Sequence, residues 1–257
     1  MLRTSLFLFL GILFYCNGFA QIAPPGLGET NTAGWFAFGI KQKLNKKETL
    51  QSTSFAGLGT ISNPDNANLF QKPSIYVVTE EITHHFKPNW KYSLAASYRW
   101  QNKYKTAAPY ELDNPKARQE IRFYGKFTYL KSFEKMAYSF TYRPELRFFY
   151  NPDFSLPEET TEFRSRLKAQ IAFTVNSLKT HKIIAATEAL FATNKTEQWD
   201  KLKYKESRLS LYYSIAIPKQ KITLNMGYMN NILGKKFSKC VHYIAFDVVL
   251  KNPFSKK

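Results

Sequence analysis

The segment 90–100 alternates between apolar and polar positions along its whole length. One set of alternate positions is apolar or aromatic: Trp90, Tyr92, Leu94, Ala96, Tyr98 and Trp100. Since the side chains of a β-strand point alternately to two faces, this pattern predicts an amphipathic strand. A tilted strand of this length rises roughly 23 Å, close to the roughly 25 Å apolar band of an outer-membrane barrel. Tryptophan favours both membrane–water interfaces, so the segment is typical of a membrane-spanning strand.

The same alternation recurs along the chain and predicts ten strands, with twelve as the alternative count. The expected strands cover approximately residues 34–44, 75–86, 90–103, 120–130, 135–150, 162–173, 181–193, 206–217, 222–228 and 244–250. Residues 50–60 alternate only weakly, so we assign them to a long loop, 45–74. The predicted fold class is all-β: an antiparallel transmembrane β-barrel, which satisfies the backbone hydrogen bonds of every strand.

The connections between the expected strands alternate between short and long. The short ones lie near Lys87, Lys131, Asn176 and Pro218, and the long ones begin near Asn45, Thr106, Asn151, Asn194 and Ile232. Outer-membrane barrels have short periplasmic turns and longer extracellular loops. The pattern therefore predicts this arrangement here, with both termini on the periplasmic side.

The N-terminal residues 1–20 combine a basic residue, a short apolar run and a small-x-small end, which predicts a cleaved secretory signal peptide. Residues 21–33 are expected to be a periplasmic lead-in, and residues 34–257 the outer-membrane β-barrel domain. Cys16 is then lost with the signal, and Cys240 stands alone, so no intrachain disulfide is expected. The predicted location is the outer membrane of a Gram-negative cell.

Composition adds to this interpretation. Aromatic residues make up 16% of the chain and the mean hydropathy is −0.38, as expected when apolar side chains occupy only alternate positions. The net charge of +18 comes from basic residues spread over strands and loops without a nucleic-acid-binding motif, so we expect no nucleic-acid partner. The expected partners are outer-membrane lipid and lipopolysaccharide, the barrel-assembly machinery and an envelope protein complex.

The polar faces of the expected strands are rich in arginine and glutamate and would line the lumen. This predicted charge belt comprises Glu120, Arg122, Arg143, Glu145, Arg147, Arg164, Arg166, Glu188, Glu206 and Arg208. Symmetric hairpins would bring Glu120 and Arg122 level with Arg143 and Glu145, and Glu188 level with Arg208; Arg164 and Arg166 would reach Glu145. The belt would either fill a narrow barrel, which we favour, or form an ion-selective constriction. Trp35, Trp90 and Trp100 are the expected aromatic girdle.

Catalysis is not expected, and we assign no catalytic, cofactor or metal-binding residue. His84, His85 and His181 fall at short-turn ends, and only His242 lies near the outer rim, within reach of the loop residues Asp113, Asp153 and Asp200. Two alternatives stay open: a small outer-membrane barrel enzyme acting on lipid or peptide, and a soluble periplasmic lipocalin-like binding barrel. The lipocalin-like barrel would have to bury the aromatic face in its lumen, where so many large side chains would overfill the space.

Several charged strand segments, taken together in order, resemble the domain-of-unknown-function 2490 family. These segments are 142–147 (Tyr-Arg-Pro-Glu-Leu-Arg), 161–167, 186–191, 206–211 and 227–229, with Trp35 leading. The resemblance covers about residues 34–250 and implies an outer-membrane barrel of a Bacteroidota-type bacterium. It implies no biochemical activity. The chain departs from general barrel habit at its end, where Phe254 is followed by three further residues.

Overall fold

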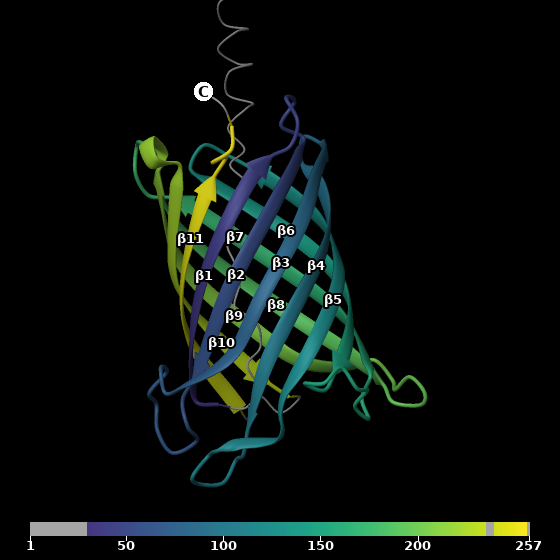
Figure 1. Ribbon diagram of the computed structural model, residues 1–257. Helices are drawn as coiled ribbons and strands as arrows, with labels where there is room; N and C mark the ends of the chain where they lie inside the picture. Colours follow the sequence, from purple (N-terminus) through teal and green to yellow (C-terminus); the bar gives the residue numbers. More distant parts are fainter. Residues whose placement is uncertain (1–29, 235–238, 256–257) are drawn as a thin grey trace, which may run out of the picture.

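The computed structural model describes residues 30–234 and 239–255, which form a closed β-barrel (Figure 1). It has eleven strands: β1 (Thr32–Lys43), β2 (Leu50–Ile61), β3 (Lys72–Lys87), β4 (Trp90–Tyr104), β5 (Leu112–Ser132), β6 (Met136–Tyr150), β7 (Thr161–Thr174), β8 (His181–Lys195), β9 (Lys203–Ile217), β10 (Ile222–Leu233) and β11 (Lys239–Lys251). A single 3-10 turn, Pro218–Gln220, joins β9 to β10. The signal peptide predicted at 1–20 and most of the lead-in lie outside the described residues.

The expected count of ten strands, or twelve, is wrong, because residues 50–61 form the strand β2. This strand lies antiparallel to both β1 and β3. Its alternation is weak because both faces mix small, polar and apolar side chains. Ser52 and Ser54 point outward and donate hydrogen bonds to Glu80, whereas Gly57 faces inward against Trp35.

An odd number of strands requires one parallel pair, which here is β1 and β11. In Figure 1 the arrows of these two neighbouring strands point to the same end of the barrel. β1 therefore starts at one end and β11 stops at the other. The expectation that both termini of the barrel lie on one side is wrong, since it depended on an even strand count.

The short connections lie at one end of the barrel and the long connections at the other. At the short-turn end, the connections 44–49, 88–89, 133–135, 175–180 and 218–221 have two to six residues. At the long-loop end, the connections 62–71, 105–111, 151–160 and 196–202 have seven to ten residues. The link from β10 to β11 is also at the long-loop end, and part of it lies outside the described residues.

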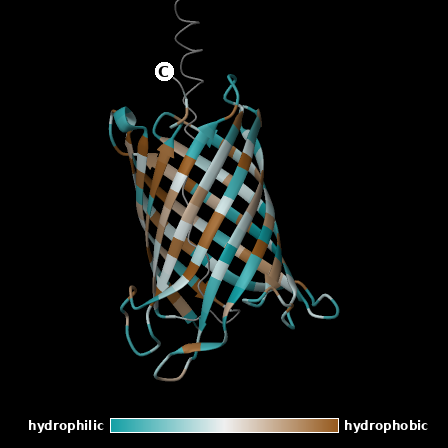
Figure 2. Cartoon of the chain, in the orientation of Figure 1, coloured by the Kyte–Doolittle hydropathy of each residue, from teal (hydrophilic) through white to brown (hydrophobic). Residues whose placement is uncertain are grey.

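Alternation along the strands gives the barrel an apolar exterior, and Figure 2 shows hydrophobic and hydrophilic positions following one another along each strand. The exposed apolar side chains come from all around the barrel and include Phe38, Val78, Leu94, Phe123, Phe140, Leu167, Leu211, Met226 and Ile244. In the described part of the chain, no helix has the length and apolar character needed to cross a membrane.

Candidate functional site in the barrel lumen

A continuous set of ion pairs crosses the barrel interior from β4 to β9. We call it the arginine–glutamate network, and it comprises seven arginines and five glutamates: Arg99, Glu120, Arg122, Arg143, Glu145, Arg147, Glu162, Arg164, Arg166, Glu188, Glu206 and Arg208. Their side chains are between 0% and 18% exposed. The network therefore carries two more positive than negative charges, on side chains that are almost entirely buried.

Glu145 lies at the centre of the network and serves three guanidinium groups. Its Oε2 atom is 3.1 Å from Arg122 Nη1. Its Oε1 atom is 2.7 Å from Arg143 Nε and 3.2 Å from Arg166 Nε. The Glu145 side chain has no exposed surface, so these arginines replace the water that a carboxylate otherwise requires.

Glu120 forms a second junction toward the long-loop end. Its Oε1 atom is 2.6 Å from Arg122 Nε and 3.9 Å from Arg99 Nε. Its Oε2 atom is 2.5 Å from Arg147 Nη2. Arg147 in turn pairs with Glu162, which extends the network to β7.

Glu188 and Glu206 continue the network on the other side. Glu188 Oε1 is 3.2 Å from Arg166 Nη1 and 3.9 Å from Arg208 Nη1. Arg208 Nη2 is 2.5 Å from Glu206 Oε1, and Asn231 of β10 donates a hydrogen bond of 3.2 Å to Glu206 Oε2. The network thus contacts strands on more than half of the barrel circumference.

Two-residue spacing explains why the strands bring these groups together. Glu120 and Arg122 are two residues apart on β5, so both side chains point inward, and the same spacing joins Glu206 to Arg208 on β9. On β6 the same spacing joins Arg143, Glu145 and Arg147. On β7 it joins Glu162, Arg164 and Arg166. Cross-strand neighbours then complete the pairs.

All ten residues of the predicted charge belt belong to the network, but the expected pairing is only partly right. The structure confirms that Glu188 lies directly opposite Arg208 and that Arg166 reaches Glu145. In contrast, Arg122 lies opposite Arg147 instead of Arg143. The hairpin turns at 133–135, later than the turn expected at 131–134, and this shifts the register by four residues.

The sequence interpretation missed other members of the site. Arg99 and Glu162 join the network, although alternation already placed both on polar faces. Glu81 of β3 was also missed; its Oε2 atom is 2.7 Å from Lys126 Nζ, and its Oε1 atom accepts a hydrogen bond of 2.7 Å from Ser93. Alternation along β3 is a signal that would have identified Glu81, because it places this residue on the same face as Thr79 and Thr83, whereas the adjacent Glu80 points outward.

The wall opposite the network is mainly apolar, and one predicted girdle residue lies in it. Trp35 was expected in the exterior girdle, but its side chain is 1% exposed and lies inside the barrel, packed over Gly57. The physical reason is alternation, since Phe36 and Phe38 point outward on the same strand. A core cluster surrounds Trp35 and includes Ile75, Val77, Tyr212, Met229, Tyr243 and Val249.

The other two girdle residues lie on the exterior, at opposite ends of β4. Trp90 is at the short-turn end and packs against Phe127 and Tyr129 of β5. Trp100 is near the long-loop end, where its Nε1 donates a hydrogen bond of 3.0 Å to Asn102.

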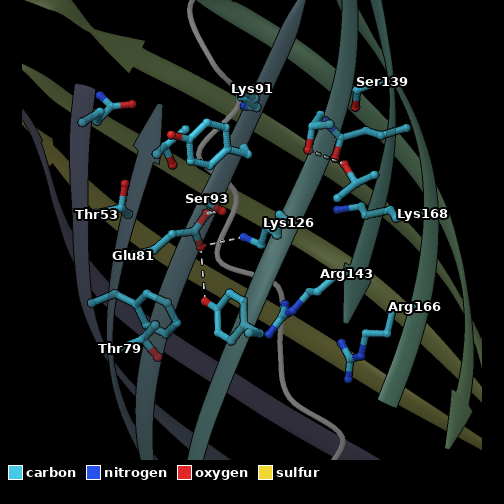
Figure 3. A pocket seen from close by; sticks show the side chains of 18 of the residues that line it. Thr53, Thr79, Glu81, Lys91, Ser93, Lys126, Ser139, Arg143, Arg166 and Lys168 are labelled. Carbon is cyan, nitrogen blue, oxygen red and sulfur yellow. Dashed lines mark hydrogen bonds and ion pairs between the residues drawn. The ribbon is translucent and has the colours of Figure 1, made fainter. Parts of the chain in front are cut away.

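A cavity of about 210 Å³ lies between the network and the short-turn end. We call it the short-turn chamber, and Figure 3 shows its lining side chains, among them Thr53, Thr79, Glu81, Lys91, Lys126, Ser139, Arg143 and Lys168. Arg143 stacks over the Tyr124 ring at 3.8 Å from its centroid. The Tyr124 hydroxyl donates a hydrogen bond of 3.2 Å to Glu81. The chamber is therefore lined mainly by cationic and hydroxyl groups.

Three of the histidines pair with tyrosines on the exterior instead of with acidic residues. His84 Nδ1 is 3.1 Å from the Tyr92 hydroxyl, and His242 Nδ1 is 2.6 Å from the Tyr228 hydroxyl. His181 similarly contacts Tyr213. His85 points inward near the short-turn end, like Thr83 two residues before it.

None of Asp113, Asp153 and Asp200 forms an ion pair with His242 in the described part of the chain. Among those residues, no group of three or more His, Cys, Asp or Glu side chains gathers as a metal site.

Comparisons with known proteins identify a family but no characterised relative. Residues 34–236 match the family described as "Protein of unknown function (DUF2490)". Neither the curated proteins nor the solved structures contain a match to the chain. The family match covers most of the sequence and nearly the whole barrel. The chain therefore belongs to the DUF2490 family.

Proposed function

We propose that this protein is an outer-membrane β-barrel whose lumen is closed by the arginine–glutamate network, and that it acts as a structural or accessory barrel. The network carries the proposal, because its side chains fill the interior between β4 and β9 while Trp35 and its neighbours fill the opposite wall. Barrels of eight strands are just wide enough for side chains to fill, and eleven strands enclose little more. The proposal therefore predicts that no solute passes through the lumen.

The exterior supports a place in lipid. Large apolar side chains such as Leu94, which is 68% exposed, cover it on all sides, and a water-soluble monomer rarely exposes so much apolar surface. Polar aromatic side chains lie at both ends: Trp90 and the His84–Tyr92 pair at the short-turn end, and Trp100 at the long-loop end. These are the positions that aromatic girdles occupy in membrane barrels. A lipocalin-like barrel would reverse this arrangement and put the aromatic face inside.

The role we propose is non-enzymatic. His84 and His242 point away from the lumen and bind tyrosine hydroxyls, and neither forms an ion pair with a carboxylate among the described residues. Most of the arginines and glutamates inside the barrel are paired with one another instead of being directed at a common substrate site. We place the short turns in the periplasm and the long loops outside, following the habit of outer-membrane barrels.

A narrow channel is the second candidate, favoured by the short-turn chamber, which extends the space inside the barrel toward one end. In that case the network would be the selectivity filter. Current through Arg143→Gln would then differ in ion selectivity from current through the unmodified protein.

Fractionation tests the proposed location. The protein should remain with outer membranes after washing in high salt, require detergent for extraction, and migrate faster on a gel when it is not heated. Release by salt alone, without detergent, would contradict a barrel embedded in lipid and would favour a soluble binding barrel.

A further inference from the structure

The short-turn chamber carries a marked surplus of positive charge. Eight cationic side chains line it: Lys41, Lys91, Arg99, Arg122, Lys126, Arg143, Arg166 and Lys168. Of the residues that the structure describes, two carboxylates, Glu81 and Glu188, line the same cavity. Without Lys41 and Lys91, and with Glu120 and Glu145 of the adjacent network included, six cations still face four carboxylates among the described residues.

The carboxylates are also shared between arginines. Arg143 and Arg166 lie directly opposite each other on β6 and β7, and both contact the same oxygen of Glu145. Glu188 is likewise shared, between Arg166 and Arg208. Two guanidinium groups that share one carboxylate oxygen leave positive potential on the side that faces the chamber.

Lys168 adds to this potential. It lies between Thr141 and Glu188 in the strand register, yet it forms no ion pair within 4 Å among the described residues, because Glu188 is paired with arginines. In Figure 3 the Lys168 side chain is seen beside those of Arg143 and Arg166, with Lys126 close by. An ammonium group in such a position favours an anionic partner.

Hydroxyl groups complete the lining. Thr53, Thr79 and Ser139 face the chamber from three different strands. Hydroxyl donors together with lysine and arginine form the donor set that recognises oxyanions such as phosphate. A ligand with two negative charges would offset more of the positive charge of the chamber than chloride. The several oxygens of such a ligand would accept hydrogen bonds from donors on several strands.

From these observations we infer that the short-turn chamber is a binding site for a small, doubly charged oxyanion of the phosphate class. The phosphate would rest on Arg143 and Arg166 at the chamber floor, with Lys168 and Lys126 beside it. This site goes beyond the proposed function and does not depend on it, since the chamber belongs to the folded barrel whether or not the barrel lies in a membrane.

The test is isothermal titration of inorganic phosphate into the purified full-length protein in a non-ionic detergent, with sodium chloride as the background electrolyte. We expect saturable binding of one phosphate per barrel that weakens as salt increases. Lys168→Met should reduce the affinity at least tenfold. Lys219→Met removes the same charge from the exposed turn at the same end of the barrel and should change the affinity less than twofold.

Heat-modifiable migration on a gel will establish that each variant is folded. If Lys168→Met does not fold, Lys91→Met at the chamber rim replaces it, with the same expected direction. Absence of saturable phosphate binding, or equal weakening in the chamber variant and in Lys219→Met, would overturn the site. Titration with a short-chain phosphatidate distinguishes the source: tighter binding than phosphate would assign the same oxyanion chemistry to a lipid headgroup.

Discussion

Arg122 and Glu145 form an ion pair with 3.1 Å between Nη1 and Oε2, and their side chains are only 1% and 0% exposed. Arg122 also contacts Glu120, whereas Glu145 contacts Arg143 and Arg166. Each charge has therefore exchanged its water for other protein charges. Because a buried charge is costly unless it is paired, the fold tolerates these groups only as a set.

The first prediction concerns this pair. Arg122→Met leaves the buried Glu145 carboxylate with one fewer partner and should lower the free energy of unfolding by about 3–5 kcal/mol. Urea titration followed by tryptophan fluorescence in detergent measures the change. The control is Lys43→Met, which removes the exposed ion pair with Glu48 and should cost less than about 1 kcal/mol. Equal losses in both variants would contradict the role given to the buried pair.

The second prediction concerns Trp35 and Gly57. A Cβ atom added at Gly57 would overlap the Trp35 indole, so Gly57→Ala should destabilise the barrel. The cost should largely disappear in a Trp35→Ala background, since the cavity left by the indole accepts the added methyl group. A double-mutant cycle of unfolding free energies measures the coupling. Additive losses would mean that the two residues act independently.

The third prediction tests the lipid-facing exterior. In lipid vesicles, Leu94→Arg should destabilise the barrel by about 2–4 kcal/mol, because it places a charge on the apolar face of β4 between Trp90 and Trp100. Leu178→Arg makes the same change in the turn 175–180 and should alter stability by less than about 0.5 kcal/mol. Unfolding titrations of the vesicle-embedded variants supply both values. If the two substitutions have the same effect, the exterior is not in contact with lipid.

The fourth prediction follows from the odd strand count. Cys240 is exposed at the start of β11, at the long-loop end, whereas Ser255 follows β11 at the short-turn end. In intact cells a membrane-impermeant maleimide should label Cys240. In a Cys240→Ser background, Ser255→Cys should react only after the outer membrane is permeabilised. The reverse pattern would invert the proposed orientation, and labelling of both positions in intact cells would contradict a membrane-spanning barrel.

Ten of the strands could be predicted from the sequence because alternation leaves a direct signal wherever one face is apolar and the other polar. β2 could not be predicted in this way, because the residue types along it are explained by contacts with residues distant in the sequence. Glycine at 57 makes space for Trp35, and Ser52 and Ser54 provide hydrogen bonds for the outward Glu80. Because β2 was not predicted, the start of β1 was expected at the short-turn end, whereas it lies at the long-loop end.

The sequence predicted which residues belong to the arginine–glutamate network better than it predicted which arginine pairs with which glutamate. Two-residue spacing alone places Glu120 and Arg122 on one face. Which arginine meets which glutamate depends on the register, and a turn placed too early moves every pair in a hairpin. Glu188 and Arg208 were paired correctly across a long connection, whereas Arg122 was paired with the wrong part of β6.

Single-channel recording in a planar lipid bilayer tests the closed lumen most directly. The comparison is between the unmodified protein and a charge-balanced variant that combines Glu120→Ala, Arg122→Ala, Glu145→Ala and Arg147→Ala, which removes two carboxylates and two guanidinium groups from the network. We predict no current steps from the unmodified barrel and steady steps from the variant, which would also demonstrate insertion. Steady, ion-selective steps from the unmodified protein would contradict a closed lumen and would make the network the filter of a channel.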